Sequence, residues 1–401
     1  MFSQSSDSLK RNCYTHKMTE INKDKFPDLP KADYREILDL TADEYVIIPV
    51  VVHVIHNGGP ENISDELIKS QIDVLNEDFG HYGTMTNDPR GADMLIRFCL
   101  AKKDPDGNPT TGIIRVKSEK TNLIASNEME TKSLSYWDPT KYMNIWIVNS
   151  IDMDNTVQGY SYMPSNSGGP SFQGDGIVLN YRYFGRNGGF VLQYNHGRTC
   201  THEVGHYFDL KHPWGGDNFK KGEGNCHDDD GIYDTPNCSA DYYSAPPVCN
   251  HPQQCGNIRM IENFMDYSLD ACMKIFTTGQ KQKMLNAISK YRGVLVSYNN
   301  LISTGCINLY DSVNSNSTVD IYPNPASNFI TFETHLIRDT SNLNISIYDY
   351  YGRMVMEKSY NDLSRTSVFL PLYNISPGVY IIKGSFGGEA FLKKIVIISS
   401  F

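Results

Sequence analysis

The sequence contains no apolar run long enough to span a bilayer, and no signal-peptide core follows Met1. Positive charge is also scarce, because 36 Lys and Arg stand against 46 Asp and Glu, giving a net charge of −10. This balance disfavours nucleic acid as the main partner, since phosphate binding needs a basic face. We expect a protein without a transmembrane helix, whose export signal has been removed or lies before residue 1.

No CxxC pair occurs among the nine cysteines, which disfavours a cysteine-rich zinc knuckle. Four cysteines are scattered, and five crowd one loop-rich stretch: Cys226, Cys238, Cys249, Cys255 and Cys272. Such a cluster predicts disulfides in an oxidising compartment. Among the scattered cysteines, Cys200 stands four residues before Val204 and eight before Phe208, which is helical spacing. It is therefore predicted to be a buried hydrophobic residue.

A histidine pattern carries the chemistry. His202 and His206 are four residues apart, so a helix places both on one face, where they can hold one metal ion. Glu203 beside them can polarise a water on that ion. His212 completes the site only if the helix ends soon after His206 and the chain turns back. Asp209 stands at that turn, where glycine is usual, and Asp tolerates left-handed backbone.

These residues resemble the metzincins, and within them the pappalysin family of zinc peptidases. The matching segments are 197–206 with Leu210, His212 and Trp214-Gly215, then 229–236, and 262–267 as the Met-turn. The resemblance covers about residues 45–300 and departs from the family at Asp209. It implies an α+β catalytic domain with a mixed twisted sheet, a backing helix, an active-site helix and an irregular lower subdomain.

The resemblance also implies roles for single residues. His202, His206 and His212 would hold zinc, and Glu203 would act as general base in peptide hydrolysis. Met265 would form an apolar floor under the imidazoles. Tyr267 would stabilise the oxyanion, although an ordinary half-buried aromatic is the alternative.

Latency and specificity rest on two further matches. Residues 1–44 are polar and resemble a pro-segment in which Cys13 blocks the zinc; an incidental thiol is the alternative. Asp270 aligns with an acidic residue of the S1′ pocket, which implies cleavage before Arg and less well before Lys. The alternative is a turn cap beside a disulfide. Self-processing before Arg35 is a corollary.

The family's calcium loop matches the side chains of Asp230, Thr235 and Asn237 with the carbonyl of Ile232. A polar turn stapled by Cys226 is the alternative. The resemblance further implies the disulfide pairs Cys226–Cys249 and Cys255–Cys272, although spacing alone leaves connectivity open.

Periodicity predicts strands at 48–55, 96–101, 143–148 and 176–181, a helix through 68–79, and a last helix that opens with a capping box at Thr277–Gln280. Beyond a Ser- and Asn-rich linker, six short strands predict a small β-sandwich: 319–322, 329–332, 345–348, 367–370, 379–382 and 391–398. That region resembles the sorting domain of type IX secretion cargo in Bacteroidetes; an Ig-like adhesion or carbohydrate module is the alternative.

The predicted organisation is a pro-segment at 1–44, a catalytic domain at 45–302, a linker at 303–318 and a sorting domain at 319–401. We expect a monomeric, latent zinc endopeptidase, secreted or at the cell surface, that acts on proteins or peptides and meets the type IX machinery. Rivals are an inactive zinc-stabilised binding or adhesion protein and a small-molecule hydrolase. Glu203 argues against the first, because a structural zinc site does not need it.

Overall fold

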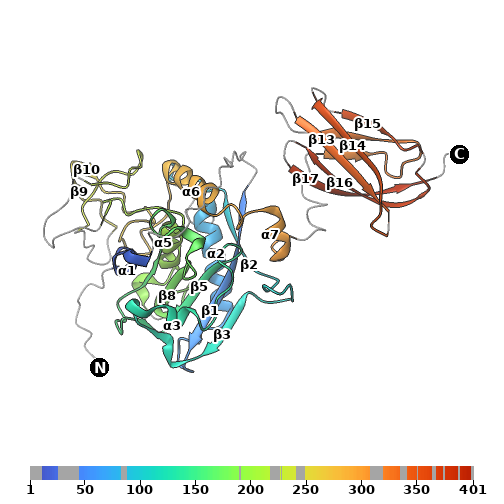
Figure 1. Cartoon of the computed structure of the whole chain (residues 1–401). Coiled ribbons are helices and arrows are strands. Elements are labelled where there is room, and N and C mark those ends of the chain that lie inside the picture. The colour runs from blue at the N-terminus through green and yellow to red at the C-terminus, as the bar shows by residue number, and fades with distance from the viewer. Residues whose placement is uncertain are drawn as a thin grey trace. The chain divides into compact units, whose positions relative to one another are not determined.

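A computed structural model describes residues 11–25, 45–82, 88–188, 191–216, 226, 228–240, 249–307, 319–334, 341–349, 351–363, 367–373, 375–386 and 389–398. The chain divides into two compact units, Met1–Cys306 and Ile307–Phe401, and each is described by itself (Figure 1). Within the described ranges, every helix is too short or too polar to cross a bilayer.

A six-stranded sheet forms the scaffold of the first unit. Its strands are β1 (Val46–His56), β2 (Ile96–Leu100), β3 (Ile113–Lys117), β5 (Met143–Val148), β7 (Gly159–Ser161) and β8 (Ile177–Asn180). The order is β2-β1-β5-β8-β7, and β3 pairs with the second half of β1. All pairs are parallel except that of β7 with β8. The predicted mixed sheet is confirmed; β3 and β7 were not predicted.

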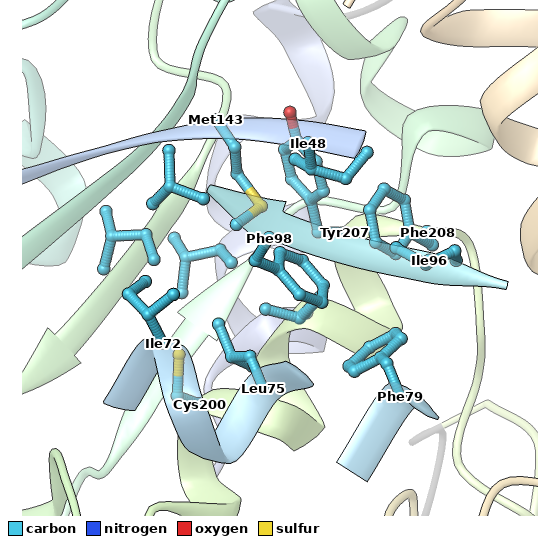
Figure 2. Packing of buried hydrophobic residues seen from close by; sticks show 14 of the residues in the cluster. Ile48, Ile72, Leu75, Phe79, Ile96, Phe98, Met143, Cys200, Tyr207 and Phe208 are labelled. Atoms are coloured by element: carbon cyan, nitrogen blue, oxygen red, sulfur yellow. The ribbon is translucent and has the colours of Figure 1, made fainter. Parts of the chain in front are cut away.

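Two helices pack on one face of this sheet: α2 (Asp65–Gly80) and α5 (Arg198–Tyr207). Side chains alternate across a strand, so Val46, Ile48, Val50, Val52 and Val54 of β1 all enter the same core as these helices. Figure 2 shows Ile72 and Leu75 of α2 near Cys200 of α5 beneath the strands, and Phe79 of α2 belongs to the same core. The predicted backing helix and the buried position of Cys200 are confirmed.

Short elements complete the first unit. They are α1 (Thr15–Asn22), η1 (Lys23–Lys25), η3 (Glu119–Thr121), β4 (Asn122–Leu123), η4 (Ala125–Asn127), α3 (Met129–Lys132), β6 (Ser150–Ile151), α4 (Pro164–Ser167), η5 (Gly169–Ser171), η6 (Tyr181–Tyr183), η7 (Leu192–Tyr194), β9 (Gln253–Gln254), β10 (Asn257–Ile258) and α7 (Tyr298–Ser303). A second core covers the sheet face opposite α2 and includes Trp146 and Val148 of β5. Helix α1 adds Met18 to that core.

Helix α6 (Thr278–Tyr291) begins with the predicted capping box, in which Thr277 and Gln280 exchange side-chain-to-backbone hydrogen bonds. Arg292 follows it and is fully buried. Its guanidinium pairs with Asp175 at 2.6 and 3.1 Å and lies 3.4 Å above the ring of Tyr207. Breaking such a pair costs about 3–5 kcal/mol, because one charge stays buried. The pair therefore fastens the end of α5.

The disulfides correct the predicted pairing. Cys226 bonds to Cys255, and Cys249 bonds to Cys272, so the two bridges interlace along the chain. Their Cα atoms are 5.2 and 5.5 Å apart, within the range a disulfide spans. The predicted pairs are wrong because the fold brings Cys226 beside Cys255 and Cys249 beside Cys272. A third bridge joins Cys99 at the end of β2 to Cys306 and was not predicted.

The second unit contains two antiparallel sheets. One holds β11 (Val319–Tyr322), β12 (Phe329–Thr334) and β15 (Ser367–Pro371); the other holds β14 (Met354–Leu363), β13 (Ser341–Tyr348), β16 (Gly378–Phe386) and β17 (Glu389–Ile397). Ile330 and Phe332 of the first share a core with Ile345 and Ile382 of the second. The predicted small all-β domain is confirmed. Strand β14 was missed because its side chains over residues 354–360 are mostly exposed and show no alternation.

Candidate metal centre and cleft

Three histidines and one cysteine meet at a single point. The ligand atoms of His202, His206, His212 and Cys13 all lie within 4.8 Å of one another. The three Nε2 atoms are 3.2, 3.2 and 3.1 Å apart. Zinc with tetrahedral Zn–N bonds of about 2.0–2.1 Å would separate its nitrogen ligands by about 3.3 Å. The donor set therefore fits zinc closely.

Backbone carbonyls select the tautomer of two imidazoles. His202 Nδ1 donates to the Phe264 carbonyl at 2.8 Å, and His206 Nδ1 donates to the Leu210 carbonyl at 2.7 Å. A carbonyl only accepts, so each Nε2 keeps a lone pair for a metal. Burial, with help from the neighbouring histidines, lowers the pKa of His202 well below its usual value. The neutral imidazole is the form that binds a metal.

The chain reverses just after the histidine helix. Helix α5 ends at Tyr207, and Asp209 adopts φ of 72°, the left-handed conformation predicted for it. The Asp209 N–H donates to the His206 carbonyl at 2.9 Å, and Asp209 Oδ1 accepts from the Ser165 N–H at 3.0 Å. These bonds offset the strain of the turn that returns His212 to the site.

Met265 packs directly against the histidine helix. It is fully buried, and a Cβ added at Gly205 would lie only 2.3 Å from its sulfur. A residue with a side chain at position 205 would therefore displace either the helix or Met265. The methionine thus lies against α5, the helix that carries two of the three histidines.

Glu203 lies beside the ligand atoms and is 1 % exposed. Its Oε2 accepts from Thr15 Oγ1 at 3.1 Å and lies 3.6 Å from Cys13 Sγ. Burial raises the pKa of Glu203 to about 7, against the opposing hydrogen bonds from Cys13 and Thr15. A carboxyl with this pKa can both take and return a proton near neutral pH.

The N-terminal segment crosses the site along the edge strand β7. The Tyr14 N–H donates to the Gly159 carbonyl at 2.9 Å, and the Gln158 N–H donates to the Asn12 carbonyl at 2.9 Å. Cys13 forms a parallel bridge with Gly159. The segment thus extends the sheet as a parallel strand, with Cys13 at the metal centre.

Asp270 is fully buried at the start of α5. Its Oδ2 accepts the backbone N–H groups of His196 and Arg198 at 3.0 and 3.2 Å, and its Oδ1 accepts from Arg11 Nη2 at 2.6 Å. A second nitrogen of Arg11 donates to Thr199 Oγ1 at 3.1 Å. Arg11 itself is 1 % exposed. Asp270 therefore caps a backbone turn and binds a cation at the same time.

Aromatic rings surround His212 on the side away from α5. Trp214 stacks on it, with centroids 4.6 Å apart, and the Tyr267 ring lies 4.8 Å away, edge-on. Arg259 lies 5.4 Å above Trp214 and pairs with Asp266 at 2.8 Å, both fully buried. The sequence predicted Tyr267 at this place but did not predict the Arg259 support.

Four oxygens converge in the loop of residues 230–235. Thr235 Oγ1 lies 2.7 and 2.8 Å from the two carboxylate oxygens of Asp230 and 2.9 Å from the Ile232 carbonyl. One hydroxyl proton cannot satisfy all three acceptors. Burial raises the pKa of Asp230 to about 6. Asn237 Nδ2 donates to the Cys226 carbonyl at 3.0 Å, while its buried Oδ1 has no hydrogen-bond partner among the described residues.

Sequence reasoning missed several buried partners of α5. Asp78 of α2 accepts from Thr201 at 2.7 Å and from Arg198 at 3.2 Å. Arg11 and Thr15 were also missed, although Arg11 stands two residues before Cys13. Such contacts join residues far apart in the chain, and no local pattern marks them.

Two family models match the chain. Residues 127–289 match the M43 peptidase model described as pregnancy-associated plasma protein-A, and residues 320–398 match the secretion system C-terminal sorting domain. The chain is 32 % identical over 245 residues to an extracellular metalloprotease of Arthroderma gypseum, covering 60 % of this chain and 71 % of the relative. It is 30 % identical over 257 residues to an extracellular metalloprotease of Arthroderma otae, covering 63 % of this chain and 81 % of the relative.

Solved structures agree with these matches. Mature mirolysin of Tannerella forsythia, in complex with a cleaved peptide, is 36 % identical with a TM-score of 0.57, covering 65 % of this chain and 98 % of that one. A promirolysin mutant of the same organism is 32 % identical with a TM-score of 0.59, covering 72 % of this chain and 98 % of that one.

We predict that His212→Ala lowers the zinc affinity of the full chain, because one of three converging imidazoles is lost. The loss should exceed the roughly 10–100-fold cost of mutating an outer partner of a ligand. Competition titration with a chromophoric chelator measures it, and His251→Ala, at a part-exposed histidine paired with Glu262, is the control. Equal affinity in the two variants would contradict the assignment.

Proposed function

The chain belongs to the M43, or pappalysin, family of metalloproteases, and from this premise we propose that it is a zinc endopeptidase produced as a latent zymogen. Its second unit is a secretion sorting domain, so the metalloprotease is extracellular. The observation that carries the catalytic proposal is the convergence of three imidazoles beside a buried carboxyl, Glu203.

His202, His206 and His212 would hold the zinc. When bound, zinc supplies a Lewis acid for the scissile carbonyl and lowers the pKa of water. Glu203 takes a proton from the attacking water and later delivers one to the leaving amine. Tyr267, whose ring lies against His212, would donate a hydrogen bond to the oxyanion.

Latency follows from the path of the N-terminal segment. Cys13 Sγ would occupy the fourth ligand position, and its contact with Glu203 would engage the general base as well. A thiolate is a good zinc ligand, so this position excludes water from the metal.

The direction of the segment explains why it would resist cleavage. Arg11 fills the Asp270 site and precedes Cys13, whereas α1 follows it. If Asp270 binds the residue after the scissile bond, a substrate must run the other way, with that residue following the metal. The segment therefore fills the cleft without placing a peptide bond in a productive orientation.

Specificity is proposed from the same contact. Two guanidinium nitrogens of Arg11 reach Asp270 and Thr199, and a lysine ammonium, which lacks this planar fork, would fit the two acceptors less well. We therefore assign Asp270 to the S1′ pocket and propose cleavage before Arg, and less well before Lys. Self-processing before Arg35 remains part of the proposal, but Arg35 lies outside the described residues.

A calcium ion is proposed for the loop of Asp230, Ile232, Thr235 and Asn237. The convergence of oxygens around a single hydroxyl proton supports it, because a hard cation would satisfy all of them. Asp234 of the same loop caps α6 through Thr277 and Gly279, so the ion would also brace that helix.

The proposed domain boundaries are those expected from the sequence: pro-segment 1–44, catalytic domain 45–302, linker 303–318 and sorting domain 319–401. The proposed partners are protein or peptide substrates and the type IX secretion machinery, with the enzyme acting as a monomer.

We predict that Glu203→Ala retains zinc but lowers peptide cleavage by at least ~10²–10⁴-fold, since the general base is lost. Both proteins are first trimmed by limited trypsin digestion, so that self-processing does not enter the comparison. The matched control is Glu119→Ala, at an exposed carboxylate of η3. Near-normal cleavage by the zinc-loaded Glu203 variant would contradict the mechanism.

We predict that cleavage-site profiling of a peptide library shows Arg after the scissile bond, and that Asp270→Ala removes this preference. The lost interaction is a charge-assisted hydrogen bond in a buried site, worth roughly 1.5–3 kcal/mol. Because Asp270 also caps two backbone N–H groups, Asp270→Asn, which removes the charge but keeps a side-chain oxygen as acceptor, is measured beside Asp270→Ala. A profile without basic residues at that position would refute the assignment.

We predict that calcium raises the unfolding temperature of the full chain and that Asp230→Asn abolishes the rise. At a calcium concentration 100 times the dissociation constant, the stabilisation is about 2.7 kcal/mol. Differential scanning calorimetry with calcium or a calcium-selective chelator measures it, and Asp106→Asn, at an exposed turn, is the control. An unfolding temperature indifferent to calcium would favour a simple polar turn.

A further inference from the structure

Helix α1 covers a surface that neither the metal centre nor the Asp270 site accounts for. Thr15, Met18 and Asn22 recur at i, i+3 and i+7, so they share one helix face, and all three are buried. Thr15 lies at Glu203, whereas Met18 and Asn22 lie farther from the metal centre along the helix. Helix α1 contacts η4 and β7 there.

A buried polar cluster receives the far end of α1. Glu128 accepts hydrogen bonds from the hydroxyls of Tyr160 at 2.7 Å and Tyr162 at 2.5 Å. Lys132 pairs with Glu128 at 2.7 Å and donates to the Gly174 carbonyl at 2.8 Å. Glu128 and Lys132 are each 1 % exposed. These bonds engage both buried charges and hold both tyrosines in place, and α1 adds one longer contact, from Asn22 Nδ2 to Glu128 Oε1 at 3.4 Å.

The hydroxyl oxygen of Tyr162 accepts a hydrogen bond from α1. Its hydroxyl proton goes to Glu128, so its oxygen is an acceptor, and Asn22 Nδ2 donates to it at 2.7 Å. Beside it, Met18 enters the buried cluster that includes Leu123 and Ala125. The surface thus offers an apolar seat next to a fixed hydrogen-bond acceptor.

The position of this surface follows from chain direction. Arg11 lies on the side of the metal assigned to residues after the scissile bond, and α1 lies on the opposite side of Cys13. The surface under α1 therefore flanks the residues before the scissile bond. It becomes accessible when the segment leaves.

We propose that this surface, lined by Leu123, Ala125, Tyr160 and Tyr162 and fixed by Glu128 and Lys132, is a distal substrate-binding site. It takes an apolar side chain at the seat of Met18 and an N–H donor, such as an Asn or Gln amide, at Tyr162. The inference rests on the proposed function, because it assumes that a peptide occupies the cleft.

Geometry gives the length of substrate required. From Thr15 to Asn22, a helix rises about 10 Å, and an extended chain covers that distance in about three residues. A substrate must therefore extend about three to five residues before the scissile bond to reach both parts of the site.

The test compares three peptides that share Arg after the scissile bond. One begins two residues before that bond. The second begins six before it, with Leu and Asn scanned through the third to fifth positions, and the third carries Asp at those positions. We expect the best Leu/Asn peptide to show about tenfold higher kcat/KM than the short one, through a lower KM, on the zinc-loaded, trypsin-trimmed protein. The Asp peptide should show no gain.

Tyr162→Phe should lower kcat/KM for the long peptide about three- to tenfold, the worth of one hydrogen bond. Tyr142→Phe is the matched control, because its buried hydroxyl donates to the Lys103 carbonyl away from the cleft. Equal kcat/KM for the three peptides, or equal effects of the two variants, would overturn the proposal.

A binding measurement separates this proposal from the proposed activity. Fluorescence anisotropy with the trimmed Glu203→Ala protein reports affinity without turnover. Tighter binding of the long peptide than of the short one would support the site even if the wild-type protein cleaved neither peptide. Equal binding of the two would contradict the site even if both were cleaved.

Discussion

Three buried imidazole nitrogens lie 3.1–3.2 Å apart, and at least two of them, on His202 and His206, turn a lone pair inward, so a bound cation would stabilise the arrangement. The rest of the catalytic unit maintains this arrangement. Asp209 returns His212 to the site, and Met265 supports α5 where Gly205 leaves no side chain. The buried Arg292–Asp175 pair fastens the end of α5.

The N-terminal segment contacts the surroundings of the metal centre on both sides of Cys13, through Arg11 and Thr15. Cys13, Arg11 and Thr15 engage, in turn, the metal centre, Asp270 and Glu203. Each of these would otherwise serve a substrate or the attacking water. The segment lies as a parallel strand beside the edge strand β7 and forms backbone hydrogen bonds with it. One segment thereby contacts the metal centre, Glu203 and Asp270 together, which supports the proposed latency.

Much of the fold could be predicted because its strongest signals are periodic. Strand β1 is buried on both faces, α2 repeats its apolar residues at helical spacing, and α6 carries a capping box. The end of α5 soon after His206 could also be predicted, because His212 reaches the metal site only if the helix stops there and the chain turns back. Strand β3 is only partly buried and β14 is mostly exposed, so neither shows a clear pattern.

The remaining features depend on where distant segments meet. The interlaced disulfides depend on which cysteines the fold brings together, and the spacing of cysteines in the sequence does not reveal this. The Arg11–Asp270 pair joins residues 259 positions apart. The cluster under α1 likewise unites η4, α3 and β7 around Glu128. Such contacts arise only once the sheet has formed, because each partner lies on a different element.

Zinc K-edge X-ray absorption of the full chain tests most directly whether Cys13 closes the metal site. With the segment in place, the account predicts one sulfur at about 2.3 Å together with nitrogen ligands at about 2.0–2.1 Å. In Cys13→Ser, or after the segment is removed, the sulfur should be absent. A full chain that fails to cleave peptides yet shows only nitrogen and oxygen around its zinc would contradict the account.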